Sequence, residues 1–289
     1  MTDEGDFVPV RGKRRCKRKP QKLSSPDSAI TFSNCEIDLQ ELKDKIERNS
    51  NDIISSDFYQ GFQEQLGQCL AIPSLASGSS TNRDPSKAGT QSPTSVTEIV
   101  CYGIGNFSTC LIARNQLALL LAMREECQVP LYKTSLYDPK FLSAEKELLL
   151  ELGVNVLDKN EECKRKCHKP TLFYMPHCGK SLYNNLLWSN WSLGLSNLII
   201  IGNSFSNMVD KNPRKQMKKA EYILSIQPYT SEVMLPQTYR LKDVFNDTAI
   251  HTFPSAKLQS CPDGFWSDKR KPEYDSEDVE FISNKKINC

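Results

Sequence analysis

Short apolar runs alternate with helical stripes of apolar residues along the middle of the chain. The runs at Glu98 to Tyr102, Thr171 to Met175 and Leu198 to Ile201 have the length of strands. The four consecutive aliphatic residues of the last run need cover on both faces, as the inner strands of a parallel sheet have. Further strands are predicted over residues 130–137, 154–157 and 221–226, with an edge element over 244–253.

Helices are predicted between these strands. Residues 111–123 are apolar nearly all round, as in a helix covered by its neighbours, whereas 141–152 and 181–191 have apolar residues three or four positions apart. Strands that alternate with helices are typical of right-handed βαβ units. We therefore predict a Rossmann-like, doubly wound α/β fold, with a mostly parallel sheet and helices on both faces.

The flanking regions have other patterns. Apolar residues from Cys35 to Leu70 recur at helical spacing among charged residues, which predicts two amphipathic helices, broken near Asn49 to Asn51, that pack on the core. Residues 73–96 are rich in Ser, Thr, Gly and Pro and predict a flexible linker. The predicted organisation is a basic disordered arm (1–30), N-terminal helices (31–72), the linker (73–96), the α/β domain (97–256) and a charged C-terminal tail (257–289).

Composition narrows the classes of protein. No apolar run approaches the roughly 18 residues that span a bilayer, and the N-terminus lacks the apolar block of a signal peptide. We therefore expect an intracellular protein without membrane contact. The 11 cysteines are scattered and odd in number, which favours reduced thiols over a disulfide framework. A net charge of +2 gives no information about acidic partners.

The N-terminal arm concentrates positive charge, with seven cations between Arg11 and Lys19. Such a block is typical of a nuclear-import or nucleic-acid-binding arm, because clustered cations release counterions from phosphate. A solvated disordered tail is the alternative. We expect at most weak nucleic-acid contact from this arm and none from the core domain. The expected location is the cytoplasm, and also the nucleus if the arm directs import.

A glycine-containing turn follows the first predicted strand. Gly103, Gly105 and Asn106 lie where open α/β sheets bind a dinucleotide or adenosyl group, since glycines let the backbone approach a ligand. Ser108 replaces the third glycine of the usual fingerprint. Asp138 ends the second strand, where an acidic residue binds ribose hydroxyls, although it follows the turn by about thirty residues instead of about twenty. The alternative is turn chemistry alone, in which Asp138 and the following proline end a strand.

The ends of two later strands are predicted to face the same crevice. Pro176, His177 and Cys178 follow one apolar run, and Asn203 and Ser204 follow the next. His177 is a candidate for binding a ligand by a hydrogen bond, with a structural role as the alternative. A nucleophilic pair of Cys178 and His177 is not favoured, because adjacent side chains at a strand end point apart. For Asn203 and Ser204 the alternative is capping of the next helix.

No metal site is predicted. Cys163, Cys167 and His168, taken with His177 and Cys178, have a superficial zinc spacing but lack the compact pairs of ligands that characterise zinc sites. His177, Cys178 and Cys167 also have the chemistry of axial haem ligands, yet a histidine or cysteine in a loop is weak evidence for haem. We therefore favour S-adenosylmethionine or another nucleotide over haem as the cofactor, without assigning one.

Five motifs in a fixed order give the chain a specific family resemblance. They are Cys101 to Phe107, Tyr137 to Pro139, Met175 to Cys178, Leu182 to Leu187 and Ile201 to Phe205. These motifs resemble those of the SRR-like family, named from "sensitivity to red light reduced", and are most similar to its animal members. The resemblance covers residues 97–253, about half of the chain.

The resemblance implies a cytoplasmic or nucleocytoplasmic regulator. The family is linked to circadian rhythm and the expression of core clock genes, and in animals and fungi to the control of haem biosynthesis. It implies no established reaction, so no catalytic residue is assigned, and protein partners are expected but not identified. Whether the protein is an enzyme therefore stays open.

Two hypotheses about function follow. We prefer a regulator with a crevice for a small ligand or a partner, because fold does not determine function. The alternative is an S-adenosylmethionine-dependent methyltransferase with a Rossmann-like fold. The glycine turn and the acidic strand end favour this alternative, and the incomplete glycine pattern argues against it.

Overall fold

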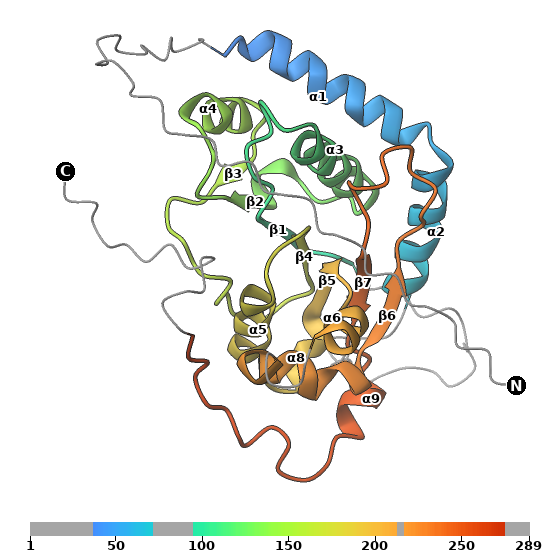
Figure 1. Cartoon of the computed structure of the whole chain (residues 1–289), viewed down its shortest axis with the longest axis vertical. Coiled ribbons are helices and arrows are strands. Elements are labelled where there is room, and N and C mark those ends of the chain that lie inside the picture. Colours follow the sequence, from blue (N-terminus) through green and yellow to red (C-terminus); the bar gives the residue numbers. More distant parts are fainter. Residues whose placement is uncertain (1–36, 72–94, 213–216, 275–289) are drawn as a thin grey trace, which may run out of the picture. The chain divides into compact units, whose positions relative to one another are not determined.

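The computed structural model describes residues 37–71, 95–212 and 217–274. Its strands within these residues form one sheet in the order β3-β2-β1-β4-β5-β7-β6 (Figure 1). The strands are β1 (Glu98–Tyr102), β2 (Thr134–Tyr137), β3 (Asn155–Val156), β4 (Thr171–Met175), β5 (Leu198–Asn203), β6 (Ser231–Met234) and β7 (Thr248–Thr252). Strands β1 to β5 pair in parallel, and β7 is antiparallel to both of its neighbours. The predicted doubly wound, mostly parallel sheet is confirmed.

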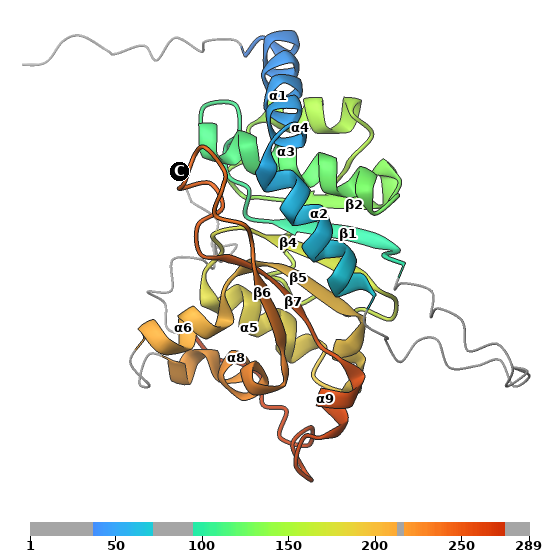
Figure 2. The same cartoon turned by 90° about the vertical axis from the view of Figure 1, so that its right-hand side faces the viewer.

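Helices cover both faces of the sheet, as Figures 1 and 2 show. The upper layer in these views holds α1 (Leu39–Ile54), α2 (Asp57–Leu70), α3 (Leu111–Glu126) and α4 (Ser143–Glu151). The lower layer holds α5 (Lys180–Ser189), α6 (Phe205–Lys211), α8 (Glu221–Ile226) and α9 (Ser255–Gln259). Short 3-10 helices occur at η2 (Leu131–Lys133), η3 (Leu193–Asn197), η4 (Lys218–Ala220) and η5 (Gln227–Tyr229).

The central strands supply side chains to two separate apolar cores. In β5, Ile199 and Ile201 pack with the α1–α4 layer, whereas Leu198 and Ile200 pack with the α5–α9 layer. Successive side chains of a strand point to opposite faces, so a strand covered on both sides is apolar at every position. This double burial is the physical reason why the apolar run at Leu198 identified an inner strand.

The N-terminal pair of helices breaks later than predicted. Helix α1 continues through Asn49 to Asn51 and ends at Ile54, so the predicted position of the break was wrong. The chain turns at Ser56, whose hydroxyl accepts a hydrogen bond from the Tyr59 backbone N–H and caps α2. Asparagine inside a helix costs only a few tenths of a kcal/mol, whereas a serine cap satisfies a free N–H group and fixes the start of a helix.

The antiparallel end of the sheet departs from two predictions. Residues 221–226 form helix α8 and not a strand, with Tyr222, Ile223 and Ile226 buried at helical spacing. A short apolar run cannot be assigned to a strand or a helix by periodicity alone. Strand β7 lies inside the sheet between β5 and β6, so the element predicted over 244–253 is not an edge, and β6 is the edge strand.

The structure describes the cysteines and the segment after α9, but only part of the predicted flanking regions. Among the described cysteines, six are free thiols: Cys69, Cys101, Cys110, Cys127, Cys167 and Cys261. Beyond α9 the chain packs on the lower layer, where Phe265 stacks on Trp191 with ring centroids 5.1 Å apart. The predicted arm, most of the linker and residues 275–289 lie outside the described residues. In the described part of the chain, no helix has the length and apolar character required to cross a bilayer.

Candidate functional site

The carboxyl ends of β1, β4 and β5 lie together at one edge of the sheet. Cys101 pairs with Tyr174, and Met175 pairs with Gly202, so the three strands end in register. The chain leaves β1 toward β2 and β3 on one side and returns to β4 on the other. In open α/β sheets such a switch point is where ligands bind.

Hydrogen bonds tie these strand ends to one another. The amide of Asn203, at the end of β5, accepts a hydrogen bond from the His177 backbone N–H (2.9 Å) and donates one to the Cys178 carbonyl (3.0 Å). The Cys178 thiol in turn donates to the carbonyl of Tyr102, the last residue of β1 (3.3 Å). The ends of β1 and β5 are thereby linked through the loop that follows β4.

The turn after β1 has one closed and one open glycine. Gly103 and Gly105 both have a positive φ, +78° and +79°, which side chains rarely adopt. A Cβ atom at Gly103 would lie 2.5 Å from Cys178 Sγ and 3.9 Å from the carbonyl oxygen of the buried Pro176. At Gly105 a Cβ atom would meet nothing within 4 Å. The protein itself therefore fills the space beside Gly103, and Gly105 is the glycine that a ligand can approach.

Asp138 supports this turn from the end of β2. Its carboxylate accepts hydrogen bonds from the backbone N–H groups of Gly105 and Lys140, both at 2.7 Å, and the residue is only 6% exposed. A carboxylate has about four acceptor positions, so two bonds do not exhaust its capacity. Asp138 thus has a structural role in the turn and lies at the position predicted for a ribose contact.

Glu145 is a site residue that the sequence analysis missed. Its side chain is fully buried, and its two oxygens accept hydrogen bonds from the backbone N–H groups of Ser108 (2.6 Å) and Leu142 (2.8 Å). The sequence signal is a glutamate three residues after the residue that precedes a helix, the acidic half of a capping box.

Asn106 closes the turn on itself. Its side-chain oxygen accepts hydrogen bonds from the Ser108 hydroxyl (2.8 Å) and from the backbone N–H and hydroxyl of Thr109 (3.0 and 2.9 Å). Such local bonding is what allows a short polar side chain to stabilise a tight turn. Asn106 is therefore at the predicted position, with its carbonyl oxygen bonded inside the protein.

His177 and Cys178 have different partners. His177 is exposed, has a φ of +53°, and its Nε2 lies 3.2 Å from the Val244 carbonyl oxygen in the β6–β7 connection. Cys178 is buried against Tyr102. The imidazole and the thiol therefore contact different elements, and of the two residues His177 is the exposed one.

Asn203 and Ser204 divide between the site and the next helix. Asn203 links the strand ends, and its backbone N–H donates to the hydroxyl of the buried Tyr183 (2.8 Å). The Ser204 hydroxyl accepts a hydrogen bond from the Asn207 N–H (3.0 Å) and caps α6. Ser204 thus has the capping role that was the alternative, and it is turned toward β6, where its hydroxyl donates to Glu232.

A sequence model described as "SRR1 domain" matches residues 60–252, from within α2 to the last residue of β7. The chain belongs to the SRR1 domain family. It is 40% identical over 218 residues to the mouse "SRR1-like protein", covering 71% of this chain and 85% of that relative. The fly "SRR1-like protein" is 30% identical over 275 residues, covering 92% and 90% of the two chains. The Arabidopsis "Protein SENSITIVITY TO RED LIGHT REDUCED 1" is 30% identical over 265 residues, covering 88% and 92%.

Glu232 anchors a polar network at the start of α6. Its carboxylate accepts hydrogen bonds from the Ser204 hydroxyl and from the N–H and hydroxyl of Ser206. Its Oε2 also lies 3.5 Å from Nε2 of the fully buried His251. Burial alone would raise the pKa of Glu232, but His251 and these hydrogen bonds outweigh it and lower the pKa to about 2. This network fixes the start of α6 against β6 and β7.

The cysteines of the SRR1 domain do not form a metal centre within the described residues, where no three potential ligands converge. Burial raises the pKa of Cys167 to about 11. The thiol is therefore neutral at physiological pH. His168 follows Cys167 in a loop and is exposed.

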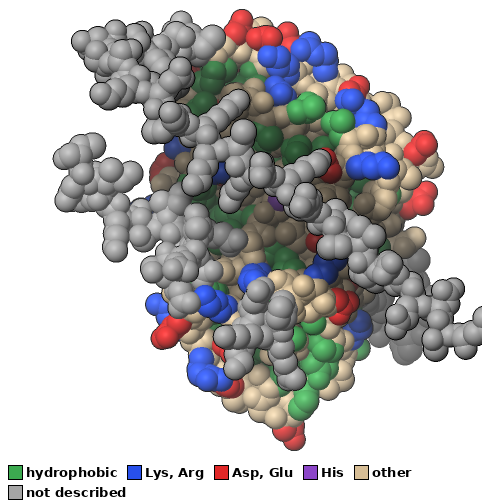
Figure 3. Space-filling model, viewed as in Figure 1, with side chains coloured by type: hydrophobic (Ala, Val, Ile, Leu, Met, Phe, Trp, Pro, Cys, Tyr) green, Lys and Arg blue, Asp and Glu red, His purple; other side chains and the backbone are tan. Residues whose placement is uncertain are grey.

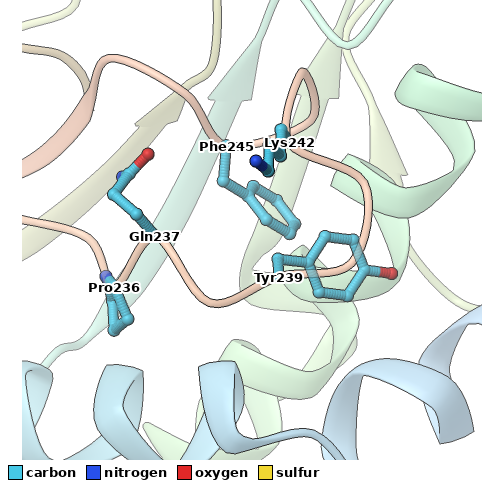
Figure 4. A pocket seen from close by; sticks show the side chains of 5 residues that line it. All are labelled: Pro236, Gln237, Tyr239, Lys242 and Phe245. Carbon is cyan, nitrogen blue, oxygen red and sulfur yellow. The ribbon is translucent and has the colours of Figure 1, made fainter.

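The β6–β7 connection of the SRR1 domain contains a small hollow, shown in Figure 4. It is lined by Pro236, Gln237, Tyr239, Lys242 and Phe245. Phe245 stacks on Phe58 of α2 with ring centroids 4.6 Å apart. The neighbouring Val244 carbonyl contacts His177 and accepts a hydrogen bond from Gln116 (3.1 Å). Helices α2 and α3 therefore hold the connection that contacts His177.

Charge on this face of the SRR1 domain is mixed. Figure 3 shows basic and acidic side chains interspersed over the visible surface, in keeping with a net charge of +2 for the whole chain. Electrostatic steering of a highly charged partner needs an extended region of one sign.

Proposed function

We propose that this SRR1 family protein is a regulator that acts by binding a small ligand at the carboxyl edge of its sheet, between the Gly105 turn and His177. The observation that carries the proposal is the convergence of the β1, β2, β4 and β5 ends at the switch point, with open space beside Gly105. Ligands of open α/β sheets bind at this position.

A regulatory role is supported by the family. The Arabidopsis relative is named for reduced sensitivity to red light. The resemblance adds control of core clock genes and of haem biosynthesis, which we propose for this chain, in the cytoplasm and, through the basic arm, in the nucleus. Imaging the tagged full chain with and without residues 11–19 tests the part played by the arm.

The ligand that best fits the crevice carries an adenosyl group, and S-adenosylmethionine is the leading candidate. Gly105 allows close approach of a ligand, and Asp138 retains acceptor capacity for ribose hydroxyls. Bound there, S-adenosylmethionine would supply an activated methyl group. His177 would face the ligand from the β4 loop, and Asn203 would hold that loop in place.

One specific observation favours a second function, that of a methyltransferase. The sheet ends in the order β5-β7-β6 with β7 antiparallel, an arrangement typical of Rossmann-like methyltransferases. Fold alone does not decide function, and the chemistry must come from residues that contact the substrate. We therefore rank transfer of the methyl group below binding of the ligand.

Ligand binding should be visible as added stability. A ligand present at 100 times its dissociation constant adds about 2.7 kcal/mol to the free energy of unfolding. We expect this stabilisation of the full chain by S-adenosylmethionine or S-adenosylhomocysteine in a thermal-shift series that also contains NAD, ATP and haem. The variant His177→Asn should bind the same ligand about tenfold more weakly, equal to about 1.4 kcal/mol.

Asparagine suits the left-handed backbone of position 177, so this variant removes the imidazole without backbone strain. Gln128→Asn is the matched control, because Gln128 has a φ of +55° and lies at the end of α3. Equal binding by wild type and His177→Asn would place the ligand elsewhere. The absence of any stabilisation by the five ligands would contradict the proposal of an adenosyl-ligand site.

The regulatory role should depend on the same crevice in cells. In animal cells without their own copy of the protein, wild type and Gln128→Asn should restore the rhythm of clock-gene transcripts and the haem content. His177→Asn should restore each to less than half of the wild-type level if its affinity for the ligand is about tenfold lower. Transcript time courses and haem extraction measure the two outcomes. Full restoration by His177→Asn would separate regulation from the crevice.

A further inference from the structure

Two carboxylates from the segment after β2 are bonded to the turn after β1. Asp138 accepts from the Gly105 N–H and Glu145 accepts from the Ser108 N–H, at 2.7 and 2.6 Å. Both residues are at least nine-tenths buried, at 6% and 0% exposure. These carboxylates therefore belong to the permanent structure of the turn.

In dinucleotide-binding Rossmann folds, the N–H groups of this turn and of the following helix bind the pyrophosphate. Here four donors of the turn bond inside the protein. The N–H groups of Gly105, Ser108, Thr109 and Cys110 bond to Asp138, to Glu145, and to the side-chain and backbone oxygens of Asn106. A phosphate arriving at the turn would have to break bonds that the protein already makes.

The local charge also opposes an anion. Neither Asp138 nor Glu145 has an ion-pair partner within 4 Å among the described residues. The charged side chain that faces the turn from α3 is Arg114, whose guanidinium donates to the Ser108 carbonyl (3.3 Å). Two carboxylates against one guanidinium leave a net negative charge, and a buried charge is poorly screened.

We propose that Glu145, together with Asp138, is a specificity-determining residue that excludes phosphate from the crevice. The ligand class is then a nucleoside without phosphate groups, uncharged or cationic, to which a sulfonium compound such as S-adenosylmethionine belongs and NAD and ATP do not. The identity of the crevice as a ligand site rests on the proposed function. The exclusion of phosphate can be tested without it.

The probe is inorganic pyrophosphate, titrated into the full-length protein at constant ionic strength, with binding followed by calorimetry. Glu145→Gln removes one negative charge and leaves a single acceptor oxygen for the Ser108 and Leu142 N–H groups, so it should bind pyrophosphate at least tenfold more tightly than wild type. Glu147→Gln is the matched control, because Glu147 is exposed on the same helix. If Glu145→Gln does not fold, Asp138→Asn serves for the same comparison.

Each outcome decides the inference. Equal affinity of wild type and Glu145→Gln for pyrophosphate would overturn it. Adenosine, S-adenosylmethionine and ATP are then compared on wild type. Stabilisation by ATP equal to that by adenosine overturns phosphate exclusion and leaves the proposed function standing. Failure of every nucleoside refutes the proposed function, whereas the pyrophosphate comparison still decides the role of Glu145.

Discussion

Replacing Gly103 by alanine should destabilise the protein by about 3 kcal/mol or more, whereas the same change at Gly105 should cost only about 1–2 kcal/mol. Both glycines have a φ close to +78°, so both variants incur the cost of a left-handed alanine. Only at Gly103 does the new Cβ lie 2.5 Å from Cys178 Sγ, which adds roughly 1–3 kcal/mol of overpacking. Urea denaturation of the three proteins measures the difference.

A double-mutant cycle isolates the contact between the two strand ends. Cys178→Ala removes the sulfur that the alanine at position 103 would meet, so the double variant should recover at least about 1 kcal/mol relative to additivity. Gly105→Ala combined with Cys178→Ala should be additive, because nothing lies within 4 Å of the Cβ at position 105. Additive behaviour at both glycines would show that the thiol does not pack against the turn.

The parallel half of the fold was predictable because its signals are local. The runs at β1, β4 and β5 are apolar at consecutive positions, and only strands covered on both faces require this. The antiparallel half was not. Strand β6 is half-exposed with no strict alternation, and the apolar run at Tyr222 to Ile226 fits a strand and a helix equally well until packing against α5 decides.

The candidate site was predictable at the level of strand ends, but not at the level of side-chain partners. Residues that follow parallel strands must gather at one edge, which brought Gly105, His177 and Asn203 together without knowledge of their contacts. That Glu145 would bond to Ser108, 37 residues earlier, depends on how α4 docks. The same holds for Val244, whose contact with His177 depends on the position of the β6–β7 connection against α2.

The β6–β7 hairpin also contains the group with the largest expected effect of pH. Glu232 is 13% exposed at its side chain and accepts hydrogen bonds from Ser204 and Ser206 beside the buried His251. Its pKa is about 2 in the folded protein against 4.5 as the ordinary value. A carboxyl whose pKa is lowered by folding stabilises the protein wherever it is ionised in both states. This stabilisation is complete above about pH 4.5 and is lost as the pH falls toward 2.

Glu232→Gln should therefore lower the free energy of unfolding at neutral pH by about 3 kcal/mol, the value of roughly two and a half pKa units. The variant should also lose stability less steeply than wild type between pH 4.5 and 2, since one of the groups that takes up a proton on unfolding is gone. Part of this pH dependence should remain in the variant because of Glu161. Burial alone would raise the pKa of Glu161, but hydrogen bonds from Arg165 and Tyr102 lower it. Chemical denaturation at several pH values measures the profile, with Glu147→Gln as the exposed control on α4.

Parallel profiles for wild type and Glu232→Gln would mean that Glu232 binds its proton equally well in the folded and unfolded chain. The network at the start of α6 would then contribute no pH-dependent stability.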